Sequence, residues 1–464
     1  MKTSIQNNNY NTMLEPSDWR FSAAINGLIQ YLDYHQLEYE IDDDYILYNS
    51  EDITEEKYLE FVEAKYGEEF HHKVVENILS NKEISDEQVK LINEKLSANI
   101  IMQKKFNKIK FDKTNKKEIL NIINENRQEL IRETFGKRSN LYANYVSVNM
   151  KAPIEILKES QGYCRLIGYA CADENRKSNS LGYSFDKKTF VGQDEKEFDF
   201  IPFSFEGDRE SFFINDNYTI KRIKNTNETL KRKIKKDLEN SDDNRSRGKD
   251  ARQALFTGII ETSDFIDRDV EVIFKDRDKG YFETLYLRKE SIDILKKLNS
   301  QGIDYKNFCF LHKVTDKYYI NVQKEVTESI INSILLDNLI ELFLKQKREF
   351  LVSQLIKING LIRGGNNMKD KLKGAFACAK QVSKVIEDNK IDSYKQKLTS
   401  SIIFKDYDRV CQILLQLSNY SGIEFGFVYD LYDNFEENKD LVYTFINALS
   451  KNTNNTEINN NESN

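Results

Sequence analysis

The longest stretch of helical periodicity in the chain lies at residues 326–361. Apolar residues recur there every three or four positions, which places them on one face of an α-helix. We therefore predict one long amphipathic helix over this range. Gly360, Gly364 and Gly365 then break the pattern, and the periodicity resumes over shorter segments. These segments predict a C-terminal bundle of four or five helices, and they cover residues 368–386, 395–404, 407–420 and 441–449.

The length of 464 residues exceeds what one hydrophobic core usually organises. A hydrophobic content of 39% with only 3 prolines is typical of a globular, helix-rich protein. We predict an α+β fold in which a mixed N-terminal and central body with short antiparallel strands precedes the helical bundle. The predicted parts are an N-terminal α+β domain, a central α+β domain with a β-hairpin, the bundle and a disordered Asn-rich tail, at 1–150, 151–322, 323–450 and 451–464.

Local patterns place the elements of the body. Pro16, Ser17 and Asp18 precede an apolar helical pattern and predict a helix that begins near Trp19. The pattern predicts strands around an acidic turn at 38–48, acidic helices at 50–96, and a strand at 198–205 with Pro202 at a bulge or edge. It also predicts a second strand at 211–217, a basic helix at 221–238, a charged loop at 239–253 and a hairpin of 269–274 with 281–287.

Neither a signal peptide nor an apolar run of membrane-spanning length is present, so we expect a cytoplasmic protein without a membrane partner. Five scattered cysteines indicate free thiols in a reducing compartment. Cys164 and Cys171 have the spacing of neither a zinc site nor a redox motif. We expect them to be buried free thiols.

The sequence contains no recognisable catalytic constellation. Gly360 and Gly365 have the spacing of a phosphate-binding loop, but Asn366 and Asn367 stand where Lys and Ser or Thr are required. None of the four histidines is followed by Asp. His71 and His72 could form a metal site with Glu76, but we expect a solvated helix face there. We therefore predict that the protein binds no metal or cofactor, and the lack of a catalytic motif lowers the odds of an enzyme.

Charge is distributed unevenly along a chain whose net charge is −7. Residues 38–69 are strongly acidic, which suits either a basic protein partner or simple solvation. Residues 104–138 and 221–236 are strongly basic. In the first basic stretch Phe106 and Phe111 alternate with lysines, a pattern that suits phosphate contacts with base stacking. The alternative is that basic runs arise from a Lys-rich composition alone.

Three motifs, in order along the chain, carry a resemblance to a known family. Trp-Arg-Phe-Ser-Ala-Ala-Ile-Asn-Gly-Leu lies at 19–28, and Phe-Ile-Pro-Phe-Ser-Phe with Glu-Ser-Phe-Phe-Ile-Asn lies at 200–205 and 210–215. Asp-Tyr-Asp-Arg-Val begins the third at 406, which ends with Phe-Ile-Asn-Ala-Leu at 445–449. Together they resemble the large subunit of a type I-B CRISPR effector complex (Cascade). The sequence lacks the CxxC pairs of many relatives, which argues against a zinc site.

The resemblance implies a non-catalytic subunit of an antiviral defense complex in a prokaryotic cytoplasm. Such a subunit binds the crRNA 5′ end beside the backbone, 5′-handle-binding and small subunits. It recognises the PAM in target double-stranded DNA, supports R-loop formation and precedes recruitment of a helicase-nuclease. Base pairing supplies most of the sequence specificity in these complexes, while protein contacts the PAM and the nucleic-acid backbone.

We assign candidate contacts within that role to loops and helices rich in Arg and Lys, because these side chains bind phosphates and groove acceptors. The candidates for PAM and DNA contact are Lys137, Arg138, Asn140, Arg245, Arg247, Lys249 and Arg252. The candidates for contact with a nucleic-acid backbone are Lys104, Lys105, Lys108, Lys110, Lys369, Lys371, Lys373 and Lys380.

Other interpretations stay open from the sequence. One is a metal-dependent nuclease of unfamiliar type, and another is a purely structural interaction protein. The helical C-terminus also resembles the small subunit of these complexes, which some relatives translate from within the same gene. A start at Met368 and a non-Met start nearer Val326 are both open for such a product.

Overall fold

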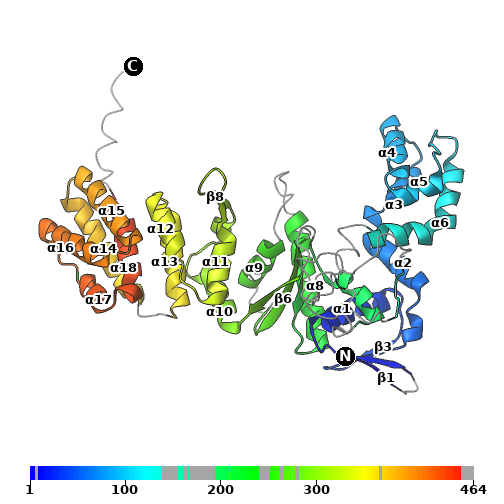
Figure 1. Ribbon diagram of the computed structural model, residues 1–464, viewed down its shortest axis with the longest axis horizontal. Helices are drawn as coiled ribbons and strands as arrows, with labels where there is room; N and C mark the ends of the chain where they lie inside the picture. The colour runs from blue at the N-terminus through cyan, green and yellow to red at the C-terminus, as the bar shows by residue number, and fades with distance from the viewer. Residues whose placement is uncertain are drawn as a thin grey trace, which may run out of the picture. The chain divides into compact units, whose positions relative to one another are not determined.

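The computed structural model describes residues 1–5, 9–137, 155–159, 166, 194–207, 210–239, 251–261, 266–276, 282–364 and 368–450. Helices dominate, and short antiparallel strands occur in the N-terminal and central parts (Figure 1), so the predicted α+β class is confirmed. The chain divides into two compact units, residues 1–255 with 269–287 and residues 256–268 with 288–464. Among the described residues, no helix is long and apolar enough to cross a membrane.

Helix α1 (Trp19–Tyr34) is the centre of the first unit. It begins where predicted, because the Asp18 side chain accepts hydrogen bonds from the backbone amides of Arg20 and Phe21 at 2.8 and 3.4 Å. Nearly every residue from Trp19 to Leu32 is buried, so α1 is enclosed on all sides. Its closest neighbour is the 3₁₀ helix η5 (Lys196–Ser204), which contacts α1 at Gly27.

The strand predicted at 198–205 is wrong, because η5 occupies this segment. Phe198, Phe200, Ile201 and Phe203 are all buried, so the segment has no solvent-facing side that would support a strand alternation. Its backbone is held by side chains instead of a neighbouring strand. The Tyr58 hydroxyl donates to the Asp199 carbonyl at 2.6 Å, and the Gln30 side chain donates to the Phe203 carbonyl at 3.1 Å.

Two antiparallel sheets flank this core, and the predicted hairpin and the strands around the acidic turn are confirmed. The first sheet has the order β1-β2-β4-β3, and the second has the order β5-β6-β7. Helix α8 (Ile220–Glu239) packs on β5, where the Asn227 side chain bonds both the amide and the carbonyl of Ile214. The strands are β1 (Lys2–Ser4), β2 (Thr12–Leu14), β3 (Tyr39–Ile41), β4 (Ile46–Tyr48), β5 (Glu210–Asn215), β6 (Val270–Asp276) and β7 (Phe282–Leu287).

A second hydrophobic core of the first unit lies among helices that cluster at the upper right of Figure 1. Ser85 opens one of them with a capping box, in which its side chain accepts from Gln88 and the Gln88 side chain accepts from Ser85. The helices that form this second core are α3 (His71–Leu79), α4 (Asp86–Leu96), α5 (Ile100–Phe106) and α6 (Lys116–Lys137). The elements before them are η1 (Ser50–Asp52), α2 (Glu55–Tyr66) and η2 (Gly67–Glu69), and the buried side chains of α2 belong to the core around α1.

The described residues of the second unit are helical apart from one short hairpin and the loops between elements. Helix α9, which covers the end of the predicted charged loop, already begins at Ala251 and spans the sequence boundary between the two units. Helix α10 follows the β6-β7 hairpin. The elements before the bundle are α9 (Ala251–Glu261), α10 (Lys289–Ser300), η6 (Tyr305–Phe308), β8 (Leu311–Lys313), β9 (Tyr319–Asn321) and α11 (Val322–Asn332).

The single long helix predicted at 326–361 is wrong, because three helices share this range: α11, α12 (Asp337–Lys345) and α13 (Glu349–Ile362). Ser333 and Lys347 adopt left-handed conformations with φ of 55° and 57°, which end α11 and separate α12 from α13. The Asn359 side chain accepts from the Leu336 amide at 2.8 Å, so a residue of α13 stabilises the break before α12.

Five helices follow Gly364 and appear at the left of Figure 1. Together with α12 and α13 they form more helical segments than the four or five predicted. Helix α18 lies at their centre and packs against α12, α13, α14, α15 and α17. The five helices are α14 (Met368–Val385), α15 (Asp388–Ile403), α16 (Tyr407–Ser421), α17 (Phe427–Asp433) and α18 (Phe435–Ala448).

Candidate nucleic-acid interface

The candidate PAM contacts lie almost entirely outside the described residues. Lys137 is the last residue of α6, and Arg252 lies in the first turn of α9, but neither side chain is described. The remaining candidates, Arg138, Asn140, Arg245, Arg247 and Lys249, lie outside the described residues. Their roles stay predictions.

The lysines near the α5-α6 turn fall into two groups. Lys104 and Lys105 both contact Glu129 of α6, Lys104 at 4.0 Å and Lys105 at hydrogen-bond distance, so the two lysines share one carboxylate. Lys108 and Lys110 are exposed on the turn and make no ion pair with any described residue. Lys108 itself adopts a left-handed conformation with φ of 66°. Of these four lysines, Lys108 and Lys110 therefore offer positive charge that no described carboxylate compensates.

The expectation that Phe106 and Phe111 stack on bases is wrong. Their exposed fractions are 1% and 3%, and both rings belong to the core formed by α3 to α6. The alternation of Lys and Phe in this stretch arises because the lysines lie on the outside of a small helical core and the phenylalanines lie inside it. Base stacking would require these rings to leave that core.

The basic helix α8 compensates much of its charge within the chain. Lys224 pairs with Asp33 at 2.8 Å, Arg222 with Asp216 at 3.3 Å, and Lys231 with Glu206 at 3.2 Å. These partners come from α1 and from the segments on either side of β5. These ion pairs hold α8 against its own unit. The helix is therefore a weaker candidate for nucleic-acid contact than its composition indicates.

Helix α14 presents the clearest basic surface. Met368–Val385 contains five lysines and one acidic residue, Asp370. Lys373, Lys380 and Lys384 are spaced at i, i+7 and i+11, together with Phe376 at i+3, so all four share one helix face. We call this set the α14 stripe. The opposite face buries Ala375, Ala379 and Val382 against the bundle.

Carboxylates compensate the α14 stripe only weakly. Lys373 lies 3.0 Å from Asp370, but both side chains are more than half exposed, so water screens this pair. Lys380 donates to the Ser450 hydroxyl at 3.0 Å, which adds no opposite charge. Lys384 is exposed and makes no ion pair with any described residue. The α14 stripe is therefore a positively charged surface.

The structure separates the four lysines predicted on this helix. Lys373 and Lys380 belong to the α14 stripe, whereas Lys371 pairs with Asp430 of α17 at 2.7 Å. The Lys369 side chain is not described. Lys384 and Phe376 are not among the predicted contacts. Their spacing from Lys373 was visible in the sequence and would have revealed them on a helical projection.

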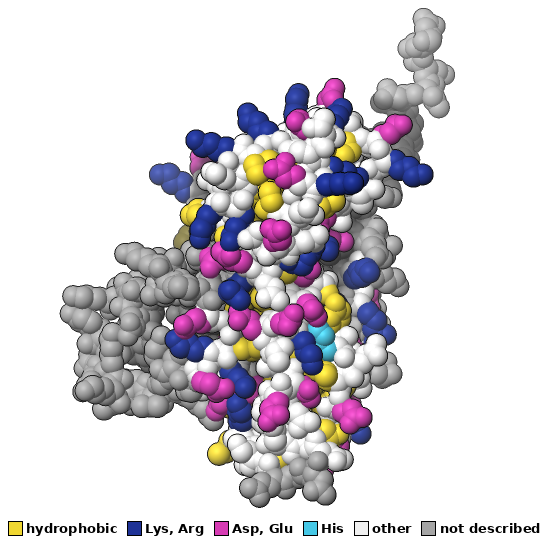
Figure 2. All heavy atoms as spheres, turned by 90° about the vertical axis from the view of Figure 1, so that its right-hand side faces the viewer, with side chains coloured by type: hydrophobic (Ala, Val, Ile, Leu, Met, Phe, Trp, Pro, Cys, Tyr) yellow, Lys and Arg dark blue, Asp and Glu magenta, His cyan; other side chains and the backbone are white. Residues whose placement is uncertain are grey.

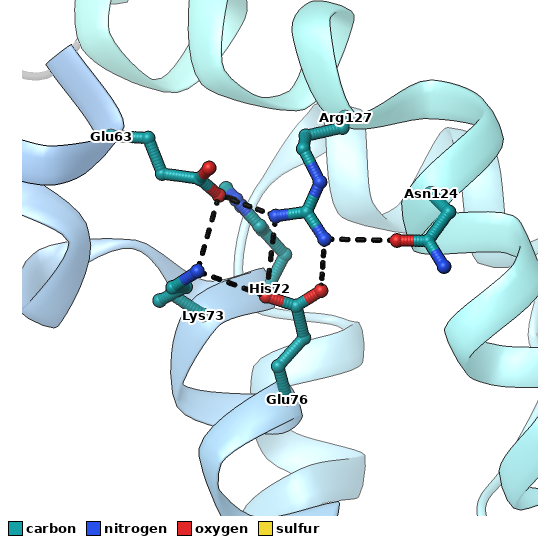
Figure 3. Close-up of polar contacts among 6 residues, drawn as sticks. All are labelled: Glu63, His72, Lys73, Glu76, Asn124 and Arg127. Atoms are coloured by element: carbon teal, nitrogen blue, oxygen red, sulfur yellow. Dashed lines mark hydrogen bonds and ion pairs between the residues drawn. The ribbon is translucent and has the colours of Figure 1, made fainter. Parts of the chain in front are cut away.

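The predicted solvated face at His71, His72 and Glu76 is wrong for His72, which is 1% exposed. Its Nε2 atom lies 3.1 Å from Glu63 Oε1, inside an ion-pair network that joins α2, α3 and α6 (Figure 3). Arg127 donates to Glu63 at 2.6 Å and also binds Glu76. Lys73 lies 3.5 Å from Glu76 and 3.8 Å from Glu63. We call this set the Arg127 network.

The Arg127 network fixes the charge state of Glu63. Burial raises the pKa of this carboxyl, but the His72 hydrogen bond and the charges of Arg127 and Lys73 outweigh burial and lower the pKa to about 2. Because the folded-state pKa lies below the ordinary glutamate value of 4.5, the stabilisation by Glu63 is complete above that pH and is lost as the pH falls toward 2.

We expect Arg127→Ala to lower the free energy of unfolding of the first unit by roughly 2 kcal/mol, because two partly buried carboxylates lose their shared partner. The loss should shrink when the pH is lowered from neutral toward 3, where the variant's carboxylates become protonated. Urea unfolding at several pH values measures this effect. A variant with Arg132→Ala, which removes a single more exposed pair with Glu55, is the matched control. Equal losses in both variants would contradict the prediction.

The surface over the second core of the first unit carries mixed charge. Figure 2 shows Lys and Arg side chains interspersed with Asp and Glu over this face, without a continuous field of one sign. Among the described residues, no group of three or more His, Cys, Asp or Glu side chains could hold a metal ion. Gly360 lies inside α13, so the break predicted at this residue is wrong, whereas Gly364, with φ of 71°, follows the end of the helix.

The comparison with known families decides the broader identity. The sequence pattern of CRISPR-associated protein Csx8 matches residues 10–449, which is nearly the whole chain. The chain belongs to the Csx8 family of CRISPR-associated proteins. The match spans both units of this Csx8 family member, including α1, η5 and the α14 stripe. No curated protein and no solved structure matches the chain.

Proposed function

We propose that this Csx8 family member is the non-catalytic large subunit of a type I-B CRISPR effector complex. In this role it binds the crRNA 5′ end and partner subunits, recognises the PAM in target double-stranded DNA, supports R-loop formation and recruits the helicase-nuclease. Family membership supports a place among CRISPR components. The subtype and the individual contacts are part of the proposal.

The observation that carries the proposal is the α14 stripe. It combines three lysines on one face of a helix, and neither Lys380 nor Lys384 has a carboxylate partner among the described residues. Such a face suits a polyanion, because each bound phosphate releases condensed counterions. The opposite face of α14 packs into the bundle, so the α14 stripe faces away from the bundle core. A bundle that carries it can bind a strand backbone without reading its bases.

The test is binding of target DNA by the complex that co-purifies with the tagged chain. We expect recovery of crRNA and partner subunits, and DNA binding that depends on the PAM. A variant with Lys373→Ala, Lys380→Ala and Lys384→Ala should bind all PAM sequences more weakly by a similar factor. Its dependence of log affinity on log salt should flatten by about 1 for each lost phosphate contact.

Lys371→Ala is the matched control, because Lys371 lies on the same helix but pairs with Asp430. It should leave the salt dependence unchanged. Recovery of the chain without RNA or partner proteins would overturn the proposed role. Metal-dependent cleavage of nucleic acid by the isolated chain, abolished by one carboxylate substitution, would instead establish a nuclease.

A further inference from the structure

The α14 stripe contains one large apolar ring among its cations. Phe376 is 49% exposed, whereas Ala375, Ala379 and Val382 of the same helix are buried. The Lys380 Nζ atom lies 5.6 Å from the centroid of the Phe376 ring. Lys373 precedes Phe376 by one helical turn and Lys384 follows it by two, so lysines bracket the ring along the helix.

An exposed aromatic ring between cations has a specific use in nucleic-acid binding. The cations contact phosphates, while the ring offers a flat surface on which an unpaired base stacks. Bases inside a duplex are already stacked on their neighbours and cannot use such a ring without being extruded. A purely phosphate-binding face would need only the lysines. The position of Phe376 therefore favours a single strand over a duplex.

We propose that the α14 stripe binds single-stranded nucleic acid and that Phe376 stacks on one of its bases. This inference rests on the proposed function and defines the ligand of the same surface. Lys373, Lys380 and Lys384 hold the phosphates on either side of the stacked base. Base identity has little influence, because every base has a π face.

A second aromatic ring beside a lysine is a weaker candidate. Lys390 lies 4.8 Å from the centroid of the Tyr420 ring and also donates a hydrogen bond to its hydroxyl. Glu387 lies 3.6 Å from Lys390. The cation there already has two partners, and the neighbouring carboxylate would repel a phosphate. The Phe376 surface lacks such a carboxylate among the described contacts of Lys380.

The experiment measures the affinity of the assembled complex for three labelled probes: a short oligothymidylate, the same backbone with abasic sites, and a duplex. We expect Phe376→Leu to weaken binding of the oligothymidylate by roughly 5- to 150-fold, the range for loss of one base stack. Binding of the abasic probe and of the duplex should change little. Phe376→Tyr should retain most of the affinity, because the ring is preserved.

Phe404→Leu is the matched control. Phe404 is 80% exposed in the same bundle, but no described lysine lies over its ring. Unchanged binding of oligothymidylate by Phe376→Leu would overturn the inference. An equal loss for the base-containing and abasic probes would also overturn it, because Phe376 would then act only through the fold. A wild-type complex that binds the duplex but no single strand would overturn the stacking proposal alone, and one that binds no nucleic acid would overturn the proposed function as well.

Discussion

Gly27→Ala will destabilise the first unit by roughly 3 kcal/mol or more, the cost of a forced steric overlap in a packed core. A Cβ atom at Gly27 would lie 2.1 Å from the Phe200 carbonyl oxygen and 2.9 Å from its carbonyl carbon. These are backbone atoms, so no side-chain rotation can relieve the overlap. Relief requires α1 and η5 to move apart, which would separate the most extensively packed pair of elements in this unit.

The backbone of η5 is held too firmly to move away from α1 without cost. The Ser204 hydroxyl donates to the Ala23 carbonyl at 2.5 Å and accepts from the Asn26 side chain at 3.2 Å. The Gln30 side chain donates to the Phe203 carbonyl at 3.1 Å. Each of these buried bonds contributes about 1 kcal/mol and would be strained or lost. The destabilisation thus reflects both the overlap and the polar contacts around it.

Urea unfolding followed by tryptophan fluorescence measures the effect directly. Trp19 is the only tryptophan in the chain, and its ring lies in this core, 5.0 Å from Phe282 and 6.3 Å from Phe205 between ring centroids. Gly374→Ala is the matched control, since a Cβ at Gly374 has open space within α14 and should leave the fluorescence transition unchanged. A Gly27→Ala transition at the wild-type urea concentration would contradict the predicted overlap.

Local signals were sufficient where the cause of a structure lies nearby in sequence. The start of α1 was predictable from Asp18, because this residue directly precedes the helix and its side chain caps the first turn. The β6-β7 hairpin follows from two apolar strands of matching length beside a polar turn. In both cases the interactions that decide the structure join residues close in the chain, so periodicity and capping rules capture them.

The errors have distant causes. The strand pattern at 198–205 is an aromatic-rich run whose two sides are both buried, against α1 and α2, and alternation cannot distinguish that situation from a strand. The break after Ser333 depends on Asn359, which lies in the next helix but one. Phe106 and Phe111 were assigned to a surface because their lysine neighbours were conspicuous, while the core that holds them is assembled from four separate helices.

The candidate interface shows the same limit. The basic character of α14 was predictable from composition, but the separation of Lys371 from Lys373 and Lys380 depends on Asp430 of α17. Conversely, Lys384 and Phe376 carry a signal at helical spacing that a search for charge alone overlooks. The compensation of Lys371 is a tertiary property, since its partner Asp430 lies 59 residues away in the sequence.

A fragment that begins at Met368 will fail to fold, whereas one that begins at Ile334 will unfold cooperatively. The shorter fragment lacks α12 and α13, which pack against α18. Its most costly loss is at Asp440, which is fully buried. Asp440 accepts a hydrogen bond from the Asn359 side chain at 3.0 Å and lies 3.4 Å from Arg363. Burial raises the pKa of Asp440 to about 6, although both partners favour the charged form.

Without α13 this carboxylate would remain in the bundle with neither partner, a change that typically costs about 3–5 kcal/mol when the group stays buried. Further contacts disappear with it. The Tyr443 hydroxyl loses its acceptor Glu341 at 2.8 Å, and Lys439 loses Asp337 at 3.6 Å. A start before α12 preserves every one of these contacts. A fragment with this start lacks α10 and α11. The hydrogen bonds that Arg288 and Ser291 donate to the Ile331 carbonyl lie outside the fragment.

Far-UV circular dichroism during thermal unfolding of residues 334–464 and 368–464 tests the prediction. The longer fragment should give a single sigmoidal transition and the shorter one a shallow loss of helix without a midpoint. Equal cooperative transitions would mean that α14 to α18 suffice as a folding unit. If the prediction holds, a small-subunit product translated from within the same gene must begin before α12, because a start at Met368 would divide the bundle through its buried polar contacts.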